Sequence, residues 1–139
     1  MIKTFLAGAL LTLALVSCKK ENNTSMVPIN DVVDSTIVPQ KVGTFSDGPY
    51  GTVAGSAKIY LKNGQYSLLL ENVSISNGPD LHVYLSREML PLNFTDLGKL
   101  RSTSGTMEYA IPLNDLGVYK YALIHCQLFD HLFGSAPLR

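Results

Sequence analysis

Apolar and polar residues alternate along most of the chain after residue 41, and this pattern predicts a β protein. Residues 52–61 alternate in this way, as expected for a strand with one buried face. The dipeptide Asn63-Gly64 separates them from a second run at residues 65–71, and Asn-Gly between two such runs is the strongest short signal of a β-hairpin. Further strands are predicted at residues 81–86, 106–111, 119–126 and 129–133. The largely apolar run at 119–126 is expected in the centre of a sheet.

The spacing of these strands predicts the fold class. After the N-terminal segment, no stretch combines a 3.6-residue apolar period with capping residues, so no helix is expected. Many short strands separated by turns are typical of antiparallel sandwiches and barrels. We therefore predict an all-β domain over residues 41–139, either an antiparallel β-sandwich or a flattened barrel. Residues 18–40 are rich in Asn, Ser, Thr, Asp and Pro, and they are predicted to form a flexible N-terminal tether.

The first 17 residues have the pattern of a secretory signal peptide. Their apolar segment, residues 5–16, is shorter than the roughly 20 residues that a membrane-spanning helix needs. It ends in Leu-Val-Ser-Cys at residues 15–18, which resembles the lipobox of bacterial lipoproteins. The resemblance implies cleavage before Cys18 and attachment of acyl chains such as palmitate to Cys18, which would anchor the protein to a membrane of the cell envelope. Lys19 stands where an aspartate would favour the inner membrane, so the outer membrane is preferred.

Charge and cysteine content narrow the range of functions. The chain has 11 basic and 11 acidic residues, and this balance argues against a nucleic-acid partner, which would favour a strongly basic surface. There are two cysteines, so acylation of Cys18 leaves Cys126 as the remaining thiol. Exported proteins usually keep their cysteines in disulfides. A cysteine without a partner is therefore a candidate for a reactive thiol, a ligand or an intermolecular bond.

Three stretches resemble the DM-thirteen family, a single-cysteine electron-transfer domain often found beside DOMON domains. They are residues 51–59, residues 78–86 and residues 97–138, the last of which contains Cys126. The second stretch opens with Gly78-Pro79-Asp80-Leu81, here called the GPDL motif. The resemblance implies an all-β domain whose cysteine takes part in redox chemistry, as a bare thiol or as the ligand of a non-covalently bound group such as haem. An aromatic residue often precedes this cysteine in the family, whereas this chain has His125.

Two other interpretations of Cys126 remain open from the residues alone. Cysteine packs as a small hydrophobe, so Cys126 could be an ordinary core residue. Alternatively, Cys126, His131 and His82 could form a copper site, because one thiolate and two imidazoles are the ligand set of a blue-copper centre. Alternation along residues 81–86 directs His82 away from the core, whereas a copper site requires it beside Cys126.

Most enzyme chemistries lack their motifs in this sequence. It has no glycine-rich phosphate loop, no Gly-x-Ser-x-Gly nucleophile elbow and no Cys-x-x-Cys pair, which also argues against covalent haem. The sequence therefore favours an envelope-anchored electron-transfer module that uses Cys126 and meets a redox partner protein, rather than an enzyme. The alternative is a non-catalytic binding module of the envelope with Cys126 in its core. A one-cysteine thiol enzyme is a third hypothesis, and it would need a cation near Cys126.

Overall fold

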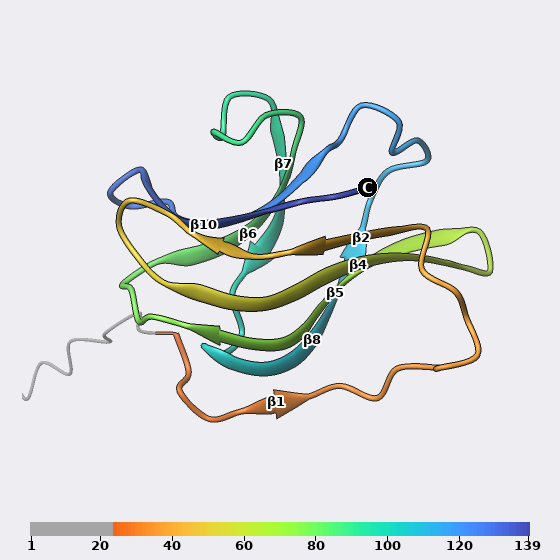
Figure 1. Cartoon of the computed structure of the whole chain (residues 1–139), viewed down its shortest axis with the longest axis horizontal. Coiled ribbons are helices and arrows are strands. Elements are labelled where there is room, and N and C mark those ends of the chain that lie inside the picture. The colour runs from red at the N-terminus through yellow and green to blue at the C-terminus, as the bar shows by residue number, and fades with distance from the viewer. Residues whose placement is uncertain (1–23) are drawn as a thin grey trace, which may run out of the picture.

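The computed structural model describes residues 24–139, and this part of the chain is built from strands arranged in two five-stranded sheets. The first sheet has the strand order β1-β8-β5-β4-β2 (Figure 1), and the second has the order β3-β10-β9-β6-β7. The strands are β1 (Ile29–Asn30), β2 (Lys41–Thr44), β3 (Ser46–Asp47), β4 (Val53–Lys62), β5 (Gln65–Ile75), β6 (Leu81–Ser86), β7 (Phe94–Lys99), β8 (Ser104–Ile111), β9 (Tyr121–Cys126) and β10 (His131–Pro137).

The two sheets pack face to face as a sandwich and do not close into a barrel (Figure 1). All paired strands are antiparallel except β1 and β8, which are parallel. The predicted all-β fold is therefore confirmed. Within residues 24–139 there is no helix of the length and hydrophobicity that crossing a membrane requires. The predicted signal peptide, the lipobox and Cys18 lie outside the described residues.

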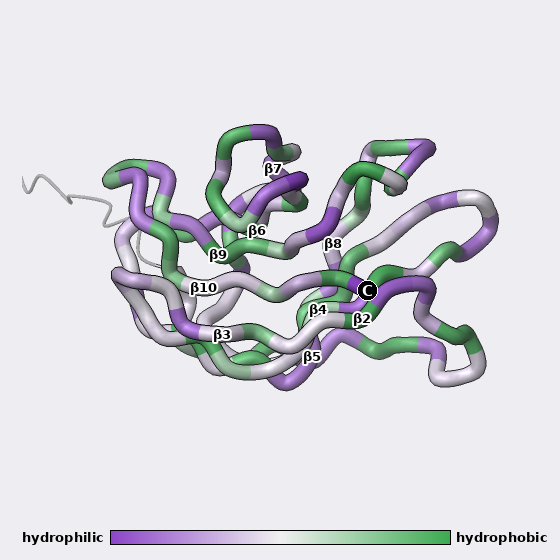
Figure 2. The backbone as a smooth tube through the Cα atoms, turned by 45° about the horizontal axis from the view of Figure 1, so that its top comes forward, coloured by the Kyte–Doolittle hydropathy of each residue, from purple (hydrophilic) through white to green (hydrophobic). Residues whose placement is uncertain are grey.

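The main hydrophobic core lies between the sheets. Strands β4, β5, β6, β8 and β9 contribute alternate side chains to it, because successive residues of a strand point to opposite faces. Hydrophobic and hydrophilic stretches are accordingly interspersed along the backbone (Figure 2). Fully buried members of this core include Ala57, Ile59, Leu68, Leu70, Val83, Leu85, Met107, Ile111, Ala122 and Ile124.

The predicted hairpin at Asn63-Gly64 is confirmed. It joins β4 to β5, with Lys62 paired to Gln65 across the turn. Asn63 and Gly64 have φ angles of +49° and +76°, and positive φ at both central positions is what a type I′ turn requires. The central position predicted for residues 119–126 is also confirmed, because β9 lies between β10 and β6.

Part of the segment predicted to be a flexible tether packs against the first sheet. Ile29 and Asn30 form β1 and pair with the edge of β8. The Asp31 carboxylate then accepts a hydrogen bond of 2.8 Å from the Glu108 amide and forms an ion pair with Arg101. The Arg101 hydrogen bond, together with the Glu108 amide, lowers the pKa of Asp31. The amino-acid composition indicates only that few side chains of this segment are buried. It does not reveal that the segment is held by backbone pairing at a sheet edge and by the carboxylate of Asp31.

Candidate functional site

Cys126 lies at the end of β9 and is enclosed by the core. It pairs with Leu81 of β6 on one side and with His131 of β10 on the other. Its side chain is 1% exposed and belongs to the cluster of core residues between the sheets. Cys126 is a free cysteine in the described part of the chain. The folded state therefore shields this thiol from reagents in solution.

The GPDL motif lies against the same end of the second sheet. Its Asp80 carbonyl accepts a hydrogen bond of 3.0 Å from the amide of Gln127, the residue after Cys126. Gly78 leaves no room for a side chain, because a Cβ atom there would lie 2.9 Å from Cζ of Phe133. The two most specific parts of the family resemblance, far apart in sequence, are thus neighbours in the fold.

His82 and His125 lie opposite each other on the outer face of the second sheet, as register partners of β6 and β9. His82 follows the core residue Leu81, and His125 precedes the core residue Cys126. Successive side chains of a strand point to opposite faces, so both histidine side chains point away from the core and from Cys126. His82 is held between two carboxylates, with Nδ1 2.9 Å from Asp96 Oδ2 and Nε2 3.2 Å from Asp80 Oδ1. Alternation along residues 81–86 correctly directs His82 away from the core.

The structure does not bring together the three residues considered as copper ligands. Cys126 faces the core, His82 faces the outer surface, and the His131 ring stacks on Tyr50 with ring centroids 3.7 Å apart. Among residues 24–139, no group of three His, Cys, Asp or Glu side chains is placed to hold a metal ion. A haem ligated by Cys126 does not fit either, because core side chains enclose the thiol.

Tyr84 is the centre of an aromatic cluster on this outer face that the sequence does not reveal. Its ring stacks on Phe94, with centroids 4.2 Å apart, and on His125, with centroids 5.2 Å apart. Gln127 Nε2 donates a hydrogen bond of 3.2 Å to the Tyr84 hydroxyl, yet burial raises the pKa of Tyr84. Alternation could place Tyr84 and His82 on one face, but the pairing with His125 depends on a register that only the fold sets.

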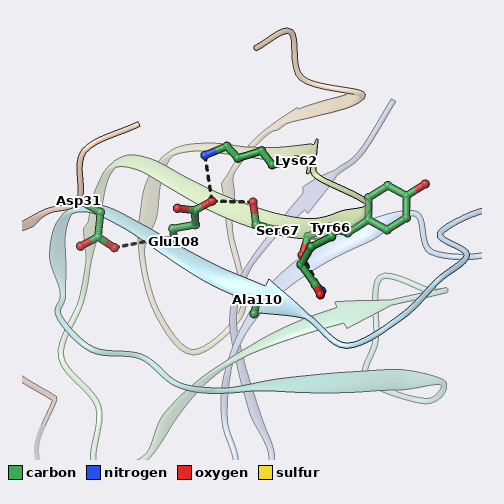
Figure 3. A pocket seen from close by; sticks show the side chains of 7 residues that line it. Asp31, Lys62, Tyr66, Ser67, Glu108 and Ala110 are labelled. Atoms are coloured by element: carbon green, nitrogen blue, oxygen red, sulfur yellow. Dashed lines mark hydrogen bonds and ion pairs between the residues drawn. The ribbon is translucent and has the colours of Figure 1, made fainter. Parts of the chain in front are cut away.

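A polar pocket of about 390 Å³ lies on the outer face of the first sheet (Figure 3). Its charged side chains form hydrogen bonds and an ion pair with other residues that line the pocket. Glu108 accepts a hydrogen bond of 2.6 Å from Ser67 Oγ and lies 3.4 Å from Lys62 Nζ, while Asp31 binds the Glu108 amide (Figure 3). None of the residues predicted from the sequence to form a site lines this pocket.

Comparison of the chain with models of known protein families shows to which family it belongs. The family model described as electron transfer DM13 matches residues 44–138. The chain belongs to this family. The matched region of the DM13 domain includes both the GPDL motif and Cys126, so the resemblance seen in the sequence is confirmed. Searches of curated proteins and of solved structures find no match.

Proposed function

We propose that this DM13 domain transfers electrons at a cell envelope, with Cys126 as its redox-active group. The family match carries the proposal, because it covers most of the described chain and contains Cys126. The burial of Cys126 restricts the type of chemistry. Thiol–disulfide exchange requires direct attack of a thiolate on a sulfur atom, and a side chain that is 1% exposed does not allow it. Loss of one electron from the buried thiol would leave a thiyl radical and release a proton, and the redox partner protein would accept the electron, so this transfer needs no contact between the partner and the thiol itself.

The second candidate function is a binding module in which Cys126 only fills the core. The same burial supports it, because Cys126 packs with apolar residues in the manner of a small hydrophobe. The two functions differ in one measurable property. A core cysteine can be replaced without loss of activity in the molecules that fold, whereas a redox-active cysteine cannot.

We expect Cys126→Ser to abolish the redox signal of the purified chain while leaving its fold intact. Serine nearly preserves the volume of the side chain, and its hydroxyl costs about 1–3 kcal/mol of stability when it is left without a partner. Protein-film voltammetry measures the redox signal, and far-UV circular dichroism measures the fold. Cys126→Ala is the matched control, because it removes the sulfur without introducing a hydroxyl. A signal that persists in both variants would assign Cys126 to the core and favour the binding module.

The location at the envelope rests on the proposed acylation of Cys18, with the outer membrane as the preferred site. We expect Cys18→Ala to remain an uncleaved or soluble precursor, because the lipobox needs its cysteine both for acylation and for cleavage. Detergent-phase partitioning of the two proteins measures the difference. Equal partitioning of the wild type and the variant would contradict the anchor, and it would leave the redox role of Cys126 unaffected.

A further inference from the structure

Three large apolar side chains are exposed near one another at one end of the sandwich. In the turn between β9 and β10, Leu128 is 65% exposed and Phe129 is 58% exposed, and Tyr50, in the loop before β4, is 56% exposed. The Tyr50 ring stacks on His131, and the Phe129 ring lies 5.9 Å from the same imidazole, between ring centroids. Singly exposed apolar residues are common, whereas a contiguous group of them marks an interaction site. We call Tyr50, Leu128 and Phe129 the apolar tip.

The residues that follow β7 lie at the same end as the apolar tip. Leu81, the first residue of β6, marks this end of the second sheet. It pairs with Cys126 on one side, and its carbonyl accepts a hydrogen bond of 2.8 Å from the Leu100 amide on the other. Leu128 follows Cys126 by two residues, and Ser102 follows Leu100 by two residues. Both therefore lie beyond the start of β6.

The chain enters the described part of the fold at this end. Ser25 forms a β-bridge with Ser102, and the Thr103 amide donates a hydrogen bond of 2.9 Å to the Ser25 carbonyl. The first described residues and the β9–β10 turn accordingly lie on the same side of the molecule, at the left in Figure 1. Cys18 is only six residues before residue 24, and six residues span at most about 22 Å. An acyl anchor on Cys18 therefore keeps this end of the sandwich beside the bilayer.

The chemistry of the apolar tip suits the surface of a lipid bilayer. Leucine and phenylalanine gain free energy when they leave water, and tyrosine is enriched at membrane interfaces, where its hydroxyl stays hydrated. The side chain of Asp130, in the same turn, is 88% exposed. Its carboxylate disfavours an anionic surface, because like charges repel. The surface that fits is therefore a bilayer with zwitterionic headgroups.

We propose that the apolar tip rests on the lipid bilayer, with Leu128 and Phe129 inserted among the headgroups. This proposal rests on the acylation of Cys18 proposed above, which holds this end of the sandwich near the membrane. The loop between β8 and β9 then points away from the bilayer, because it lies at the other end of β6. There the Lys120 amide donates a hydrogen bond of 2.9 Å to the Ser86 carbonyl.

The chain has no tryptophan, so a single introduced tryptophan reports on its own surroundings. Full-length Phe129→Trp, isolated from bacterial membranes, is reconstituted on phosphatidylcholine vesicles with or without brominated acyl chains, which quench a tryptophan that they contact. We expect its emission to shift to shorter wavelength on the vesicles and to lose most of its intensity with the brominated lipid. Val118→Trp is the matched control, because Val118 is 47% exposed and lies in the β8–β9 loop. Its emission should keep its intensity.

Two results would overturn the proposed orientation. Equal quenching at positions 118 and 129 would show that neither end faces the bilayer preferentially. Stronger quenching of Leu92→Trp than of Phe129→Trp would place the β6–β7 loop on the membrane instead, since Leu92 is 72% exposed in that loop. Leu128→Trp repeats the measurement in the same turn if Phe129→Trp fails to fold.

Flotation of the wild type with the vesicles separates this proposal from the proposed function. A wild type that floats, combined with equal quenching at both ends, would keep the acyl anchor and overturn the orientation. A wild type that does not float would overturn the anchor and the orientation together. Neither result bears on the redox role of Cys126, which voltammetry of Cys126→Ser tests independently.

Discussion

Replacing Gly55 by alanine is expected to lower the free energy of unfolding by roughly 2–6 kcal/mol, from backbone strain and overpacking together. Gly55 has a φ angle of +108°, which residues with a Cβ atom rarely adopt. A Cβ atom there would also lie 2.8 Å from the carbonyl oxygens of Glu71 and Asn72. These are backbone atoms of β5, beside the register shift between Ala54 and Ser56. No rotation of a side chain can therefore relieve the contact.

Gly64→Ala is the matched control for this prediction. Gly64 also has a positive φ, at +76°, but a Cβ atom there would meet no atom within 4 Å. Its substitution should cost only the conformational penalty of about 1–2 kcal/mol. Denaturant-induced unfolding of both variants separates the two effects. Equal losses of stability would show that close packing between β4 and β5 is not what requires glycine at position 55.

The features that the sequence predicts well are those that depend on neighbouring residues. The Asn63-Gly64 turn, the boundaries of β6 and the outward direction of His82 follow from local pattern alone. The central place of β9 follows from its nearly continuous apolar sequence, because a strand covered on both faces needs no polar side.

Other features depend on contacts between distant segments and escape local reasoning. The sequence does not predict β7, because the polar residues and glycine of Phe94–Lys99 do not alternate with apolar ones. β1 is too short to show a period and depends on the edge of β8 for its hydrogen bonds. The stacking of Tyr84 on Phe94 and His125 requires three strands in one register.

The register also explains why Cys126 and the histidines do not form one site. The sequence separates Cys126 from His131 by four residues and supplies His82 from another strand, which suffices for a ligand set but not for its geometry. In the fold, His82 pairs with His125 rather than with Cys126. A shift of one residue would reverse the faces, but it would also expose Leu81 and Val83. Burial of the core therefore decides the arrangement.

Phe133→Ala is expected to lower the free energy of unfolding by about 3–5 kcal/mol, the usual cost of removing a large buried aromatic ring. The Phe133 side chain is 6% exposed and packs where two glycines leave room for it. A Cβ atom on Gly51 would lie 2.6 Å from Cγ of Phe133, and one on Gly78 would lie 2.9 Å from its Cζ. The ring thus holds the loops that precede β4 and β6 against the core that contains Cys126.

Because the Phe133 ring packs against the core that contains Cys126, Phe133→Ala is also expected to change the accessibility of the Cys126 thiol. The cavity and the loosened GPDL motif should let a thiol reagent reach Cys126 faster than in the wild type, under conditions where both proteins remain folded. Phe129→Ala is the matched control, because Phe129 lies in the adjacent β9–β10 turn and is 58% exposed. Its substitution should change stability by no more than about 0.5 kcal/mol. If Phe129→Ala destabilised the fold as much as Phe133→Ala, or if Cys126 labelling were unchanged in Phe133→Ala, the ring would not be what encloses the thiol.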